Sequence, residues 1–154
     1  MKCIGVITAF LFVSAFGVFA KAYYAGEVEM IQGSEFIAIV NVTRIEQTNT
    51  VGSVWSYRQR AHGTVEIMIK GELPSEVTLH GEESFICAQV RFKPGRHLLF
   101  LRRDGKLLVG SNWHLSVRPI TETKVEWYVP GERLELSWQP LSEVLDRIAA
   151  TAKK

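Results

Sequence analysis

Apolar and polar residues alternate with a period of two along much of the chain, which is the pattern of β-strands that bury one face. The clearest case is segment 64–70, where branched apolar residues occupy every second position and Glu66 and Lys70 lie on the opposite face. Segment 36–45 starts apolar on both faces, which predicts a strand buried on both sides. The pattern therefore predicts a fold built mainly of antiparallel strands.

Shorter segments of the same kind follow, separated by turn residues. Asp104-Gly105 is a strong hairpin signal, and Pro94-Gly95 and Pro130-Gly131 mark further turns. The additional strands are predicted at 76–80, 97–102, 106–109, 114–120, 125–129 and 134–138.

One helix is predicted at the end of the chain. Apolar residues recur there at helical spacing, and Ser142 is a good N-cap candidate. They are Leu141, Val144, Leu145, Ile148, Ala149 and Ala152. The stripe predicts packing against the sheet, so we expect a single domain over 23–154 that ends in this helix.

Residues 1–22 have the features of an export signal. Lys2 precedes an apolar run from residue 4 to residue 19, and Ala20-Lys21-Ala22 fits a signal peptidase site. Cleavage after Ala20 fits nearly as well. An uncleaved anchor is the alternative, but the run is shorter than the roughly 20 residues that span a bilayer. We therefore expect an exported product, secreted or periplasmic, without stable membrane insertion.

Charge and cysteine content narrow the function classes. Without Lys2 and Lys21 the chain has 16 basic and 16 acidic residues, which argues against a nucleic-acid partner. Cys87 is then the only cysteine left, so the domain has no internal disulfide. Apolar neighbours favour a buried thiol, with an intermolecular bridge or a reactive thiol as alternatives.

The order of several segments resembles the netrin-like module, the group that includes the tissue inhibitors of metalloproteinases. The segments are the strand at 36–42, VEIMIKGELP at 65–74, Cys87, FKPGRHLLFL at 92–101 and GKL at 105–107. The resemblance covers roughly residues 36 to 120. It implies an OB-like five-stranded Greek-key barrel with a packed α-helix, and residues 125–154 would be a C-terminal extension.

The chain departs from that family at its cysteines. The mature chain would start near Tyr23 without the N-terminal cysteine by which metalloproteinase inhibitors grip zinc. The disulfide partners are also missing, and Ser111-Asn112-Trp113 stands where a further cysteine is expected. The resemblance therefore implies the fold and argues against inhibition by zinc chelation.

The candidate binding residues lie in segment 47–59, which is predicted to be a long loop after the first strand. Long loops often carry function, and this connection is a frequent ligand loop in OB barrels. It holds Trp55 and Tyr57, followed by Arg58 and Arg60, residue types that are common in interface hot spots. The alternative is that Trp55 and Tyr57 begin the second strand and pack inward on one face.

No pattern for catalysis or for a metal stands out. His62, His80, His97 and His114 are too widely spaced to predict a metal site, and no cofactor motif is present. We therefore expect a non-enzymatic module that binds an exported protein partner. A small thiol or hydrolytic enzyme that uses Cys87, and a glycan-binding barrel, remain as alternatives.

Overall fold

The computed structural model describes residues 23–85 and 87–152; the predicted export signal at 1–22 lies outside them. The fold is mainly β, with a C-terminal helix, as predicted. Its elements are α1 (Glu27–Gly33), β1 (Phe36–Val51), β2 (Ser56–Lys70), β3 (Glu76–Glu83), β4 (Gly95–Asp104), β5 (Leu107–Gly110), the 3₁₀ helix η1 (Trp113–Ser116), β6 (Val117–Thr121), β7 (Lys124–Tyr128), β8 (Leu136–Pro140) and α2 (Leu141–Ala152).

The eight strands are hydrogen-bonded in the order β1-β2-β3-β5-β4-β6-β7-β8. In addition, β1 pairs with β4 along its other edge, so the pairings of the first five strands return to their start. The contact between β3 and β5 is parallel, and the other pairings are antiparallel. The sheet is thus larger than the five-stranded barrel that the resemblance implied, because β6, β7 and β8 extend it beyond β4.

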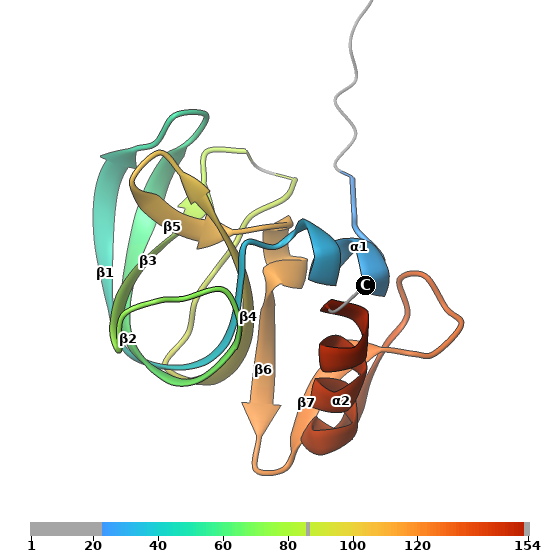
Figure 1. Ribbon diagram of the computed structural model, residues 1–154. Helices are drawn as coiled ribbons and strands as arrows, with labels where there is room; N and C mark the ends of the chain where they lie inside the picture. Colours follow the sequence, from blue (N-terminus) through green and yellow to red (C-terminus); the bar gives the residue numbers. More distant parts are fainter. Residues whose placement is uncertain (1–22, 86, 153–154) are drawn as a thin grey trace, which may run out of the picture.

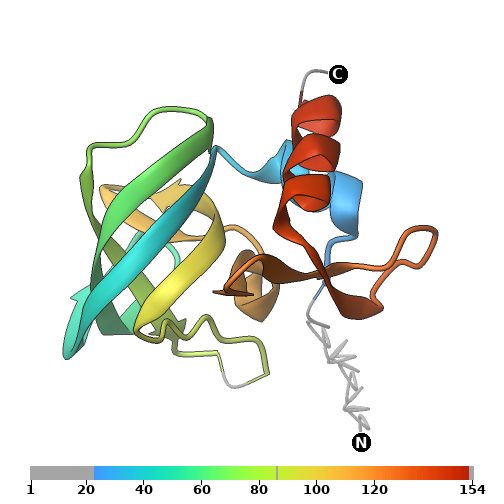
Figure 2. The same cartoon turned by 90° about the horizontal axis from the view of Figure 1, so that it is seen from below.

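Two hydrophobic cores share β1 and β4 as a common wall. Alternate residues of β4 point to opposite sides, with Leu99 and Leu101 in one core and Leu98 and Phe100 in the other. We call them the inner core, which β1–β5 surround, and the helix-side core, which α1, α2 and β7 cover (Figures 1 and 2). The double burial explains why segment 36–45 starts apolar on both faces.

The predicted loop at 47–59 is wrong. Strands β1 and β2 continue into it and pair as far as Val51 and Ser56, so that only residues 52–55 connect them. On β1 no residue from Thr43 to Val51 is buried, and on β2 the buried positions include the polar Gln59, so the apolar alternation that marks a strand is missing. Polar contacts replace it, such as Arg44 with Glu46 at 2.7 Å along β1 and Arg60 with Glu46 at 3.9 Å between β2 and β1.

The helix-side core depends on two helices, of which only α2 was predicted. Helix α2 begins at Leu141, so Ser142 lies in its first turn and is not the N-cap. Helix α1 has seven residues, too few for a periodic pattern, yet it buries Met30 and Ile31. The Lys70 ammonium donates to the carbonyls of Ile31 and Gln32 at 3.0 Å and holds the end of α1.

Candidate functional site

Three aromatic side chains from three separate connections meet at one end of the sheet. Trp55 lies in the β1–β2 turn, Phe85 follows β3, and Trp113 begins η1. Their ring centroids are 5.8 to 5.9 Å apart, and each side chain is half-buried. Val54, beside Trp55, is 67% exposed. We call these four residues the aromatic patch.

The backbone at Trp113 supports a specific arrangement of the patch. Its φ is 48°, in the left-handed region that residues with a Cβ rarely adopt. Such conformations persist where surrounding contacts fix them, and they are common at binding sites. In this case the left-handed residue carries one of the three rings.

The turn that carries Trp55 is tied to the end of β4. The Asp104 carboxylate accepts hydrogen bonds from the Ser53 N–H at 2.7 Å and from the Tyr57 hydroxyl at 2.8 Å. Within the turn, the Gly52 N–H donates to the Trp55 carbonyl at 2.8 Å. A Cβ on Gly52 would collide with the Asp104 carboxylate, so glycine is required there. The turn is therefore held in one position relative to β4.

The electrostatics of this tether favour an ionised Asp104. Burial alone would raise the pKa of Asp104, but hydrogen bonds from Tyr57, Ser53 and Val54 outweigh it and lower that pKa below its ordinary value. Burial, followed by the hydrogen bond to Asp104, raises the pKa of Tyr57. The pair therefore consists of a carboxylate and a neutral phenol at neutral pH.

The structure separates the residues that the sequence had grouped. Trp55 lies in the patch. Tyr57 is fully buried, and its hydroxyl donates to the Asp104 carboxylate that holds the turn. Arg58 is exposed on β2. Arg60 is half-exposed, and its guanidinium reaches Thr48 at 3.4 Å and Glu46 at 3.9 Å. The expectation that Trp55 and Tyr57 share an inward face is thus correct for Tyr57 alone.

The loop after β3 is fastened by two buried polar side chains. The Gln59 amide pairs with the backbone of Phe92, accepting from its N–H at 2.7 Å and donating to its carbonyl at 3.2 Å. The Glu83 carboxylate accepts from the Val90 N–H at 2.8 Å. Glu83 is buried, and its carboxylate supplies the acceptor that the Val90 N–H would otherwise find in a neighbouring strand. Burial raises its pKa.

Cys87 is exposed, so the expectation of a buried thiol is wrong. The apolar neighbours on which that expectation rested point elsewhere, since Ala88 and Val90 are buried in alternation along the loop. Within residues 23–85 and 87–152, no hydrogen bond joins the Cys87 thiol to a histidine. In the same ranges, no three His, Cys, Asp or Glu side chains converge as a metal site would require.

Phe85 and Trp113 are site residues that sequence analysis missed. Neither lies in an alternating segment, and their partner Trp55 is distant in sequence.

Comparisons of the chain with models of protein families, with curated proteins and with solved structures gave no match. None of the helices in the part of the chain that the structure describes is long and apolar enough to cross a membrane.

Proposed function

We propose that this chain is an exported, non-enzymatic binding module that contacts a protein partner through the aromatic patch. The observation that carries the proposal is the meeting of three half-buried rings from three connections, next to the exposed Val54. Aromatic side chains dominate the centres of protein interfaces, because each buries a large area at a small cost in conformational entropy.

The rigidity of the patch strengthens this proposal. Asp104 fixes the turn that carries Trp55, and Glu83 and Gln59 fix the loop that follows Phe85. A surface that is ordered before binding loses less entropy when the partner docks. The loop after the first strand, where the sequence placed the site, thus contributes Trp55 but acts together with two other connections.

We further propose that strands β1–β5 form an OB-like barrel of the netrin-like type. Two observations support this: the return of the strand pairings from β4 to β1, and the parallel contact between β3 and β5. OB folds commonly bind their ligands through the loops at one end. Because the N-terminal cysteine of the metalloproteinase inhibitors is missing, the proposal does not include zinc chelation. The proposed contact surface is the aromatic patch and not the N-terminus.

A protein partner fits the patch better than a flat ligand does. The ring planes meet at angles of 39° to 71°, so the three rings do not form one continuous flat face. They form a contoured apolar surface with an exposed aliphatic residue beside it, which suits the side chains of a protein.

The proposal is tested by capture of the partner from the exported fraction of the source organism. Purified protein is crosslinked in that fraction, and captured proteins are identified by mass spectrometry. We expect a partner that is captured by the unaltered protein and lost on Trp55→Ala or Trp113→Ala.

Trp138→Ala is the matched control, because Trp138 is 47% exposed on β8, outside the patch. Thermal unfolding of each variant establishes that it is folded. Capture that persists in the folded Trp55→Ala and Trp113→Ala variants, or that is lost equally with Trp138→Ala, contradicts the proposal.

A further inference from the structure

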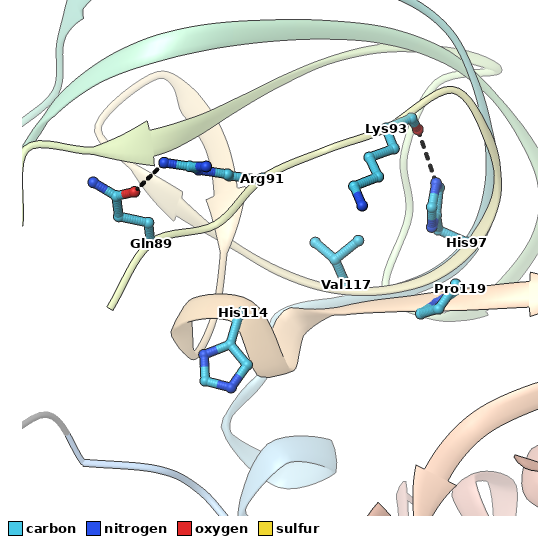
Figure 3. Close-up of a pocket in the computed structure, with 7 residues that line it drawn as sticks. All are labelled: Gln89, Arg91, Lys93, His97, His114, Val117 and Pro119. Atoms are coloured by element: carbon cyan, nitrogen blue, oxygen red, sulfur yellow. Dashed lines mark hydrogen bonds between the residues drawn. The ribbon is translucent and has the colours of Figure 1, made fainter. Parts of the chain in front are cut away.

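A pocket of about 330 Å³ lies between the loop after β3 and strand β6 (Figure 3). It is lined by Gln89, Arg91, Lys93, His97, His114, Val117 and Pro119. At about 30 Å³ per water, the volume equals about eleven water molecules. This is the lower end of the range for small-molecule sites, about 300–1,000 Å³.

The loop contributes one polar face to this pocket. Residues 89, 91 and 93 line it, whereas Val90 and Phe92 between them are buried in the inner core. The backbone contacts of Glu83 and Gln59 hold this alternation in place, since they bind Val90 and Phe92. The pocket wall is therefore fixed by the same contacts that order the loop.

The opposite wall is formed by Val117 and Pro119 on β6 and by His97 on β4. Val117 and Pro119 are two residues apart, so they face the same side of the strand. The buried His97 ring contacts the Lys93 carbonyl through Nε2 at 2.8 Å. Burial lowers the pKa of His97, so the ring is neutral at neutral pH and adds no charge to this wall.

The positive charge of the pocket is concentrated at Lys93. The Arg91 guanidinium already contacts Gln89 at 2.9 Å and Glu82 at 3.7 Å. Lys93 is exposed, and its ammonium forms no hydrogen bond or ion pair with the residues that the structure describes. Figure 3 shows this ammonium directed into the space between the loop and Val117. One uncompensated positive charge thus faces an apolar wall.

We propose that this pocket binds a small organic carboxylate with a compact apolar body. The carboxylate would pair with the Lys93 ammonium, and the apolar body would lie against Val117 and Pro119. A single cation without an ion-pair partner matches a monoanion in charge, whereas a phosphate dianion would leave one negative charge without a partner. The site is separate from the aromatic patch and does not depend on its function.

The probe for this site is 3-phenylpropanoate, with the neutral 3-phenylpropanamide and inorganic phosphate as comparisons. Each is titrated into the ¹⁵N-labelled protein, and the backbone amide signals are followed by NMR. We expect saturable shifts at Gln89, Lys93 and Val117 with the carboxylate. The amide should bind about tenfold more weakly or worse, because it lacks the charge-assisted contact.

Variants separate charge from shape. Lys93→Met should weaken carboxylate binding about tenfold, and Lys93→Arg should retain it. The matched control Lys106→Met removes an exposed cation from the β4–β5 turn and should change nothing. Val117→Phe narrows the pocket without a change in charge and should abolish binding of both the acid and the amide.

Four results would overturn the proposal. The first is no saturable shift at the pocket amides with 3-phenylpropanoate. The second is equal affinity for the acid and the amide. The third is equal affinity of the unaltered protein and its folded Lys93→Met variant for the acid. The fourth is phosphate binding as tight as that of the carboxylate.

Discussion

The inner core and the helix-side core lie on opposite sides of the same two strands, yet they are stabilised differently. The inner core consists of aliphatic side chains and Phe92, and strand ladders surround it. The helix-side core contains buried polar groups with specific partners. The Trp127 indole donates to Glu27 at 2.7 Å, and the Tyr128 hydroxyl donates to the Ala25 carbonyl at 2.8 Å. Non-directional packing thus dominates the inner core, where Gln59 and Glu83 fasten the loop that carries Val90 and Phe92, whereas directional hydrogen bonds join the elements of the helix-side core.

This difference separates a general scaffold from a part of the molecule that depends on particular residues. Apolar packing tolerates exchange among residues of similar volume. Hydrogen bonds between α1 and β7 do not, because a buried group without its partner is costly. The predictions below test this contrast, from the largest expected effect to the smallest.

Removal of Trp127 should have the largest effect on stability. Trp127 is fully buried, its ring lies 5.1 Å from that of Phe100, and it binds Glu27. Trp127→Ala should lower the free energy of unfolding by about 3–5 kcal/mol, from the cavity and the lost hydrogen bond. Urea unfolding followed by circular dichroism measures it. Trp138→Ala, at an exposed position, should stay within about 0.5 kcal/mol of the unaltered protein.

Removal of Arg147 tests the hydrogen-bond network of the helix-side core. Its guanidinium contacts Glu27 at 3.0 Å, Gln139 at 2.9 Å and the Tyr128 carbonyl at 3.0 Å. Arg147→Met keeps the aliphatic stem and should cost about 1–3 kcal/mol in the free energy of unfolding. Arg58→Met is the control on the exposed face of β2. A cost no greater than that of the control would mean that this network does not position α2.

Loss of the Asp104 tether should have a comparable or smaller effect on stability and a clear one on the patch. Asp104→Ala leaves the Ser53 N–H and the Tyr57 hydroxyl without their acceptor, at about 1–3 kcal/mol. Because the folded-state pKa of Asp104 is lowered, its contribution is present above the ordinary value of 3.8. It is lost as the pH falls through the folded-state pKa.

The pH dependence of unfolding checks this tether. As the pH falls below 3.8, the free energy of unfolding of Asp104→Ala should decrease less steeply than that of the unaltered protein. An identical acid profile would show that Asp104 is not held as described. Tyr57→Phe removes only the hydrogen bond from the phenol to Asp104 and should have the smaller effect.

Glu83 should give the smallest effect, with the opposite sign. Its folded-state pKa is raised by burial, so the folded state binds the proton more tightly than the unfolded chain does. Stability should therefore decrease as the pH rises from the ordinary value of 4.5 through the raised folded-state pKa. Glu83→Gln keeps an oxygen for the Val90 N–H and should remove this slope. The same slope in the variant would assign it to another group.

The strands around the inner core were predictable because their pattern is local. Alternation at a period of two places β1 to β5 correctly in outline, and the Asp104-Gly105 signal places the β4–β5 turn. The ends of β1 and β2 were missed because β1 has no buried residue after Val42 and the polar Gln59 interrupts the buried positions of β2. The strand predicted at 114–120 begins only at Val117, because residues 113–116 form η1.

The helix-side core and the site could be predicted only in part. Trp127 and Glu27 are 100 residues apart, and no local pattern reports that they bind each other. The same holds for Trp55, Phe85 and Trp113, which become neighbours only when three connections meet. Trp55 was found because aromatic residues in a connection suggest binding. For Tyr57 the sequence left a binding role and an inward face open, because its hydrogen-bond partner Asp104 is 47 residues away.

Site-specific photocrosslinking tests the proposed binding surface most directly. A photoreactive phenylalanine analogue replaces Val54, which is 67% exposed in the patch, or Ile67, which is 45% exposed on β2. Each protein is irradiated with the partner captured from the exported fraction. If the aromatic patch is the contact surface, the partner should be crosslinked from position 54 and not from position 67. A crosslink from position 67 alone, or equal crosslinks from both positions, would contradict it.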